Sequence, residues 1–244
     1  MIISHKLKVI YIRLCKVAGT SFELALSKYC GPDDILTPIG EGGKEYREFE
    51  GFPEAQNYMD PETQKPKFVH HTSAKKIKRL VPKHIWNDYL KVATIRCPYD
   101  MFISGYYFFT NEEKRAKEES FEKYLAETNR EFHKIYGLHK NGKILADFLI
   151  RYEHLDEDIK ELESKIGCPK LLEIFQSVTA KQKTRPKENT SSYEIYSQYP
   201  NAKLIIDQKC SKLAEEYEFF QKYWPMYKSK LEKDIEENKV TQNK

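Results

Sequence analysis

The sequence lacks the long apolar runs of a membrane protein. Its longest apolar stretch, Met101 to Phe109, is interrupted by Ser104 and Gly105, whereas a spanning helix needs about 18 to 20 apolar residues. The first residues contain no long apolar segment followed by a small-residue cleavage site, which argues against a secretory signal. We therefore expect no membrane span and no membrane partner.

Cysteine is also scarce, and charge is nearly balanced. The five cysteines, at positions 15, 30, 97, 168 and 210, include no Cys-x-x-Cys pair, which argues against a disulfide framework or a zinc site and predicts a cytoplasmic protein. The net charge of +4 is too small to indicate nucleic-acid binding. A hydrophobic content of 40% in 244 residues excludes a disordered chain.

Strand-like and helix-like segments alternate along the chain. Runs rich in β-branched and aromatic residues predict strands, and apolar residues at helical spacing predict helices. The predicted strands cover residues 8–14, 67–70, 89–96 and 144–153, and the predicted helices 22–29, 74–80, 99–109, 156–166 and 213–224. This alternation predicts an α/β fold, a single domain over residues 1–227 with a central, mostly parallel sheet flanked by helices.

Two segments differ from this pattern. Residues 40–66 hold four of the ten glycines and three of the eleven prolines, which predicts a long surface loop. Residues 228–244 are highly charged and form a predicted tail, either an exposed helix or disordered.

An anion site is predicted where the first strand meets the first helix. The loop and helix start contain Lys16, Ala18, Gly19, Thr20 and Ser21. Backbone N–H groups at a helix N-terminus attract anions, while the glycine allows close approach and the lysine and hydroxyls add further donors. The loop is not a Walker A motif, in which the lysine comes last. Taken alone, the pattern also fits an ordinary turn with a capped helix.

A second anion-binding arrangement follows the 89–96 strand. Arg96 ends that strand and Ser104 lies in the next helix. Because ligands of open α/β sheets bind at the carboxyl ends of strands, both strand ends together suit a ligand with two separated phosphates. An arginine at a strand end fits a surface ion pair equally well.

Together these stretches resemble one family. KVIYIRLCKVAGTSFE at 8–23 resembles the 5′-phosphosulfate loop of sulfotransferases that use 3′-phosphoadenosine-5′-phosphosulfate (PAPS), especially their carbohydrate branch of Golgi-type and bacterial members. RCPYDMFISGYY at 96–107 resembles the 3′-phosphate motif, and DFLIRYEHL at 147–155 a later Arg-Tyr-Glu-x-Leu strand. HTSAKKI at 71–77 and IWNDYLKVATI at 85–95 resemble the stretch before the 3′-phosphate motif. The resemblance covers most of residues 8–225, and it implies a P-loop-like nucleotide-binding fold.

The resemblance also implies an activity and the residues for it. The reaction would move a sulfuryl group from PAPS to an acceptor hydroxyl, favoured on a carbohydrate, with no metal required. Lys16 would neutralise the leaving phosphate oxygen, and His71, or its neighbour His70, would take the acceptor proton. A late basic loop with Lys183, Arg185 and Tyr193 resembles the segment that closes over the nucleotide, although a solvated run of charges explains it equally.

Three positions depart from the family pattern. Cys15 stands where proline is usual, Val17 where a hydroxyl residue is usual, and Met101 where a second arginine is frequent. They leave open a non-catalytic member of the fold that binds a nucleotide or a glycan. A P-loop-type kinase is the other alternative, but it would need Ser or Thr directly after the loop lysine and an acidic magnesium ligand at a strand end.

Overall fold

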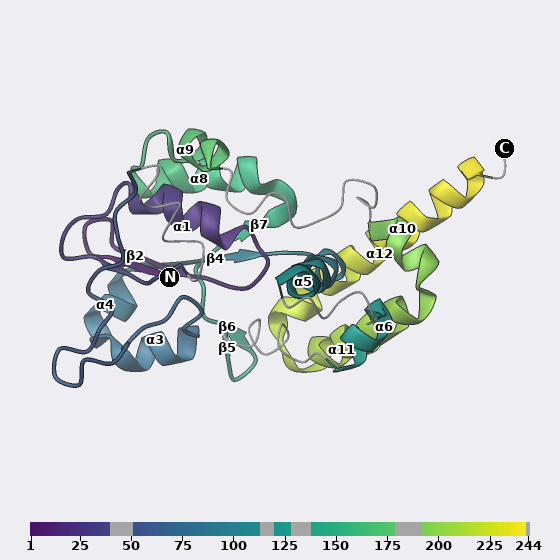
Figure 1. The fold of residues 1–244 in the computed structure, drawn as a ribbon, viewed down its shortest axis with the longest axis horizontal. Coiled ribbons are helices and arrows are strands. Elements are labelled where there is room, and N and C mark those ends of the chain that lie inside the picture. Colours follow the sequence, from purple (N-terminus) through teal and green to yellow (C-terminus); the bar gives the residue numbers. More distant parts are fainter. Residues whose placement is uncertain (40–50, 113–119, 128–137, 179–191, 243–244) are drawn as a thin grey trace. The chain divides into compact units, whose positions relative to one another are not determined.

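The computed structural model describes residues 1–39, 51–112, 120–127, 138–178 and 192–242 (Figure 1). The chain divides into two compact units. The first, the sheet unit, comprises Met1–Arg96, Lys134–Leu138 and Leu145–Ala180. The second, the helical unit, comprises Cys97–His133, His139–Ile144 and Lys181–Lys244.

Five strands form one mixed sheet in the sheet unit, in the order β3-β1-β2-β4-β7. Their bounds are Ile2–Ser4 (β1), Val9–Ile12 (β2), Ile35–Leu36 (β3), Leu90–Ile95 (β4) and Phe148–Arg151 (β7). The β2–β4 and β4–β7 pairs are parallel, whereas β1 is antiparallel to both β2 and β3. The prediction of a mostly parallel sheet is therefore wrong. A connection as short as residues 5–8, between β1 and β2, can only join antiparallel strands.

The three parallel strands are those predicted from buried apolar runs. β2 is buried throughout and pairs with β4 in the register Val9↔Leu90 to Ile12↔Ala93. The carboxyl ends of β2 and β4 consequently lie side by side. The predicted strand at 67–70 is wrong, because Thr72 folds this segment into a turn: the Val69 N–H donates to Thr72 Oγ1 at 2.7 Å, and Oγ1 donates back to the Val69 carbonyl at 2.8 Å.

Helices cover both faces of this sheet. Figure 1 shows α1 (Gly19–Ser27), α8 (Leu155–Ile166) and α9 (Leu171–Ser177) on one face, and α3 (Ala74–Leu80) and α4 (Lys83–Asp88) on the other. The main core forms where Phe22 of α1 and Ile159 and Leu162 of α8 pack on Tyr11 and Ile150 of the strands. The helices predicted near 22–29, 74–80 and 156–166 are confirmed.

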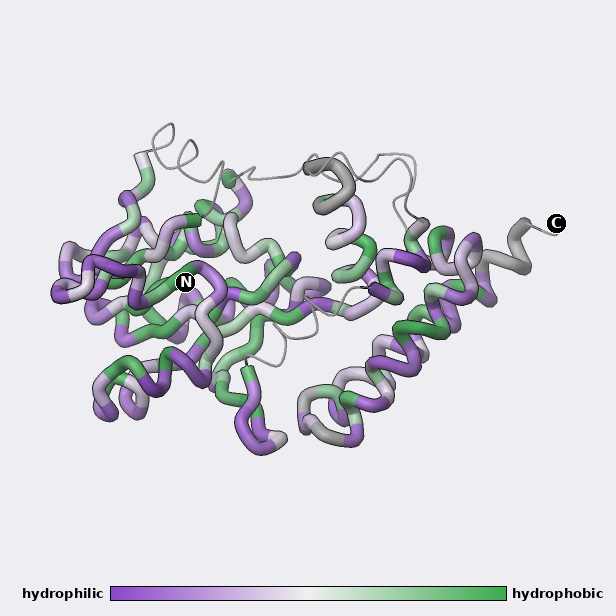
Figure 2. The backbone as a smooth tube through the Cα atoms, turned by 60° about the horizontal axis from the view of Figure 1, so that its bottom comes forward, coloured by the Kyte–Doolittle hydropathy of each residue, from purple (hydrophilic) through white to green (hydrophobic). Residues whose placement is uncertain are grey.

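The helical unit is built from helices and one small hairpin. They are α5 (Pro98–Glu112), α6 (Phe121–Glu127), α10 (Ser192–Gln198), α11 (Pro200–Glu216) and α12 (Glu218–Gln242), with the hairpin β5 (His139–Lys140) and β6 (Lys143–Ile144). Hydrophobic and hydrophilic residues alternate along α12 (Figure 2). Tyr99 of α5 packs its ring against Tyr196 and Trp224. The single helix predicted at 213–224 is divided at Tyr217, which lies between α11 and α12.

The segments 40–66 and 228–244, which differ from the alternating pattern of the sequence, also differ in structure over their described residues. Residues 40–50 lie outside the described residues, and 51–66 form turns with the isolated bridges Leu36↔Gln56 and Met59↔Pro66. The charged tail continues α12 as far as Gln242. Within the described part of the chain, no helix combines the length and apolar character needed to cross a membrane.

Candidate active site

The loop between β2 and α1 has a strained, anion-binding shape. Lys16 and Ala18 both adopt the left-handed region, with φ of 58° and 57°, while Val17 between them does not. Such an alternation turns successive N–H groups toward one side, which forms a concave site for an anion. Each left-handed non-glycine residue costs about 1–3 kcal/mol and persists only when its surroundings hold it. α1 then begins at Gly19 without a side-chain cap.

Arg96 is one of the groups that hold this loop. Its Nη1 donates to the Lys16 carbonyl at 3.0 Å, and its guanidinium lies 3.8 Å from the centre of the Tyr152 ring. The buried Nε of Arg96 has no hydrogen-bond partner among the described residues. An N–H in this state is costly unless an acceptor arrives. A phosphate oxygen at this strand end would satisfy it, so the residues present suit an anionic nucleotide.

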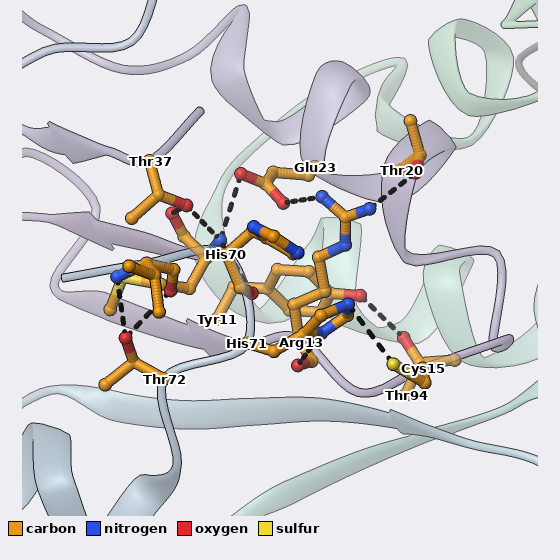
Figure 3. Close-up of polar contacts among 12 residues, drawn as sticks. Tyr11, Arg13, Cys15, Thr20, Glu23, Thr37, His70, His71, Thr72 and Thr94 are labelled. Atoms are coloured by element: carbon orange, nitrogen blue, oxygen red, sulfur yellow. Dashed lines mark hydrogen bonds and ion pairs between the residues drawn. The ribbon is translucent and has the colours of Figure 1, made fainter. Parts of the chain in front are cut away.

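Arg13 lies directly beneath the first turn of α1 (Figure 3). Its Nη2 donates to Thr20 Oγ1 at 2.7 Å, which leaves the hydroxyl hydrogen of Thr20 to donate elsewhere. A Cβ on Gly19 would meet Arg13 Cγ at 3.0 Å and the Tyr11 hydroxyl at 3.4 Å. A larger residue here would have to displace the Arg13 side chain by a few tenths of an ångström, so this close approach favours glycine.

Glu23 neutralises the buried positive charges of this network. Its Oε2 accepts from Arg13 Nη1, and its Oε1 accepts from the amino group of Met1, both at 3.0 Å. The Glu23 side chain is 0% exposed and that of Arg13 7% exposed. Buried charges are tolerated only when paired in this way. The network thus anchors α1 to β2 beneath the anion-binding loop.

We expect Glu23→Ala to lower the free energy of unfolding by about 3–5 kcal/mol, because it leaves two buried cations without their counter-charge. Urea unfolding followed by circular dichroism measures the loss. Glu161→Ala, on the exposed face of α8, is the matched control and should change stability by no more than about 0.5 kcal/mol. Equal losses in the two variants would show that the network does not stabilise the fold.

The two candidate histidines lie in the turn before α3, and not on a strand. His71 Nδ1 lies 3.1 Å from the Arg13 carbonyl oxygen, and its Nε2 lies 3.2 Å from Cys15 Sγ. The rings of His70 and His71 meet edge to face with their centres 4.4 Å apart. Because both residues lie in a turn, they do not face opposite sides as adjacent residues of a strand do. His71 is the histidine that contacts the loop (Figure 3).

The other predicted site residues fall in different places. Thr20 and Ser21 are buried in the first turn of α1. Ser104 lies in α5 of the helical unit. Lys183 and Arg185 lie outside the described residues, and Tyr193 is described only as part of the backbone of α10. Their predicted contacts with a nucleotide stay predictions. In the described ranges, no group of three or more His, Cys, Asp or Glu side chains is arranged to hold a metal ion.

Two of the departures from the family pattern are packed inside the protein. Val17 and Met101 are each 2% exposed. Their side chains therefore serve packing, and their identity says little about phosphate binding.

Three residues of the loop environment, Arg13, Glu23 and Tyr152, were not predicted as site residues. Arg13 interrupts the apolar run Val9–Leu14, which begins with β2, and Glu23 interrupts the apolar residues of α1 ten positions later. A charged residue inside each of two adjacent buried segments is a signal for a buried pair. Tyr152 has no comparable signal, because its ring meets Arg96 only through the pairing of β4 with β7.

Comparison with known proteins agrees with this geometry. No curated protein and no solved structure matches the chain. A family model described as the sulfotransferase family, however, matches residues 1–223. The match spans both the β2–α1 loop and the end of β4. The strained β2–α1 loop carries a lysine, and the arginine that follows the neighbouring strand holds this loop. The chain therefore belongs to the sulfotransferase family.

Proposed function

We propose that this sulfotransferase takes the sulfuryl group from PAPS and transfers it to a hydroxyl group of a carbohydrate acceptor. The observation that carries the donor assignment is the contact between Arg96 and the Lys16 carbonyl. It joins the two segments that resemble the 5′-phosphosulfate and 3′-phosphate motifs at neighbouring strand ends. Such a pair suits a nucleotide with two separated anionic groups.

The residues of the loop have separate tasks in this proposal. The backbone N–H groups of the loop and the first turn of α1 bind the 5′-phosphosulfate oxygens. Arg96 binds the 3′-phosphate and also holds the Lys16 carbonyl. The ammonium group of Lys16 neutralises the negative charge that develops on the leaving phosphate oxygen during sulfuryl transfer. Catalysis here is mainly positioning and electrostatic stabilisation.

His71 is the proposed base. Because a carbonyl oxygen only accepts, the His71 Nδ1 next to the Arg13 carbonyl carries the proton. The lone pair is then on Nε2, which lies 3.2 Å from Cys15 Sγ. It takes the proton of an acceptor hydroxyl that replaces the thiol as its donor. A histidine anchored through one ring nitrogen in this way has a defined orientation.

Titration calorimetry tests the donor assignment. The desulfated product 3′-phosphoadenosine-5′-phosphate should bind, whereas ADP and ATP should bind far more weakly. The opposite preference would favour a kinase. A transfer assay with ³⁵S-labelled PAPS then separates an enzyme from a binding protein. Glycans, lipids, small alcohols and tyrosine peptides are offered as acceptors, and label on glycans alone is the expected result.

We expect Arg96→Ala to weaken binding of 3′-phosphoadenosine-5′-phosphate by about 10–100-fold, the value of a lost charge-assisted hydrogen bond. Adenosine 5′-phosphosulfate, which lacks the 3′-phosphate, should lose less affinity. It should still lose some, because the Lys16 carbonyl also loses its donor. Calorimetry with both ligands measures the difference.

Arg79→Ala, on the exposed side of α3, is the matched control and should bind both ligands like the wild type. Equal losses for the two ligands in Arg96→Ala would mean that Arg96 acts only through the loop and does not contact a 3′-phosphate.

A further inference from the structure

Cys15 and His71 form a close pair that sulfuryl transfer does not require. Cys15 directly precedes Lys16, at a position where the family usually has proline. Its Sγ lies 3.2 Å from His71 Nε2, which is within hydrogen-bond reach for sulfur. The thiol is only partly buried. The pair therefore combines a nucleophilic group, a basic group and access to reagents.

The direction of the proton in this pair follows from the other side of the imidazole. His71 Nδ1 must be the protonated nitrogen, because its partner is the carbonyl oxygen of Arg13 at 3.1 Å. Nε2 therefore presents a lone pair to the sulfur. The thiol donates to it, and transfer of that proton produces a thiolate beside an imidazolium.

The surrounding groups favour the thiolate. Lys16 follows Cys15 in the chain, and α1 begins four residues after Cys15. A neighbouring cation and the N-terminal end of a helix both stabilise a thiolate. The Arg13 guanidinium is already paired with Glu23. The His70 ring packs against the ring of His71. The carboxylate of Glu23, the anion of this network, is paired with Arg13 and with the Met1 amino group.

We propose that Cys15 is a modification site, an activated thiol that reacts with peroxides and soft electrophiles with His71 as its base. With a peroxide, the thiolate attacks one oxygen, an S–O bond forms and the O–O bond breaks. The sulfur is oxidised to a sulfenic acid and the peroxide is reduced. With hydrogen peroxide, the leaving hydroxide takes the proton from His71 Nε2 and departs as water.

Modification would also place a new group beside the lysine of the donor loop. This consequence for sulfuryl transfer rests on the proposed function, but the reactivity of Cys15 does not. We therefore chose a test that detects the thiol itself and needs neither a nucleotide nor an acceptor.

The test is competitive alkylation of the folded full chain. Iodoacetamide is added at about pH 6.5, where an ordinary thiol is only about 1% thiolate, and labelling of each cysteine is followed by mass spectrometry. N-acetylcysteine is the reference for an ordinary thiol. Cys30, which is also partly exposed while burial raises its pKa to about 12, is the unreactive control within the chain. We expect Cys15 to react at least about tenfold faster than N-acetylcysteine, and Cys30 to react more slowly than N-acetylcysteine.

His71→Asn identifies the base. Its side-chain amide keeps a donor for the Arg13 carbonyl but has no basic nitrogen, and it should slow labelling of Cys15 by about tenfold. Labelling of Cys30 should not change, which shows that the variant is folded. In a parallel arm, hydrogen peroxide followed by dimedone should trap a sulfenic acid at Cys15 of the wild type. Labelling of Cys15 no faster than that of N-acetylcysteine, or unchanged labelling of Cys15 in His71→Asn, would overturn the proposal.

Discussion

Lys16→Ala is expected to lower the rate of sulfuryl transfer by about 10²–10³-fold, the usual effect of removing one transition-state charge partner of about 3–4 kcal/mol. In the proposed reaction, the ammonium group neutralises charge that develops on the leaving oxygen only as the transition state forms. Turnover should therefore fall much more than affinity for 3′-phosphoadenosine-5′-phosphate. Initial rates at saturating PAPS and calorimetry with the product measure the two effects.

Alanine suits this position because of the backbone. Lys16 has φ of 58°, and alanine, like lysine, carries a Cβ in this strained region, so the loop is not relaxed as it would be by glycine. The hydrogen bond from Arg96 to the carbonyl at residue 16 is also retained. Lys75→Ala, on the exposed side of α3, is the control. Full activity in Lys16→Ala would exclude Lys16 from catalysis.

His71→Ala is expected to lower turnover by about 10²–10⁴-fold while nucleotide affinity stays close to that of the wild type. The reason is the loss of the Nε2 lone pair, which takes the acceptor proton in the proposed reaction. Protonation of this nitrogen in acid removes the same lone pair, so the wild-type rate should also fall as the pH is lowered. Steady-state rates across the pH range measure both effects.

Two further variants separate the base from the structure around it. His71→Asn keeps the hydrogen bond to the Arg13 carbonyl and should be as inactive as His71→Ala. His70→Ala removes the ring packed against His71 but keeps the backbone carbonyl of residue 70, which lies 3.4 Å from the Met1 amino group, and should retain most activity. An inactive His70→Ala beside an active His71→Ala would assign the base to His70. Activity in all three would place the base elsewhere, for example on a carboxylate of the 40–66 loop.

Much of the fold could be predicted because its central elements have strong local patterns. β2 is a continuous apolar run and β4 is a mostly apolar, largely buried strand. α3 and α8 coincide almost residue for residue with the predicted helices. The sequence predictions fail where the local pattern is weak or misleading. β1 has only three residues, and its antiparallel pairing depends on the turn that follows it. The 67–70 segment has the composition of a strand, but Thr72 closes it into a turn.

The candidate site was predictable in part for the same reason. The lysine, the glycine and the hydroxyls of the β2–α1 loop are close in sequence, so their spacing reveals the anion site. Arg13 and Glu23 interrupt apolar runs, which is a sequence signal for a buried pair, but their contact with each other depends on how the end of β2 packs against α1. The division of the chain into two units also follows from contacts between distant segments, and these have no local pattern.

The residue types proposed for sulfuryl transfer and their order along the chain could be predicted from the sequence, because the β2–α1 loop and the end of β4 each form a contiguous motif. The arrangement of these motifs in space depends on the tertiary structure. The parallel pairing of β2 with β4 brings Arg96 to the Lys16 carbonyl, 80 residues apart in the chain, and a turn before α3 brings His71 to Cys15, 56 residues apart. Such contacts depend on strand register and packing, which are properties of the whole chain.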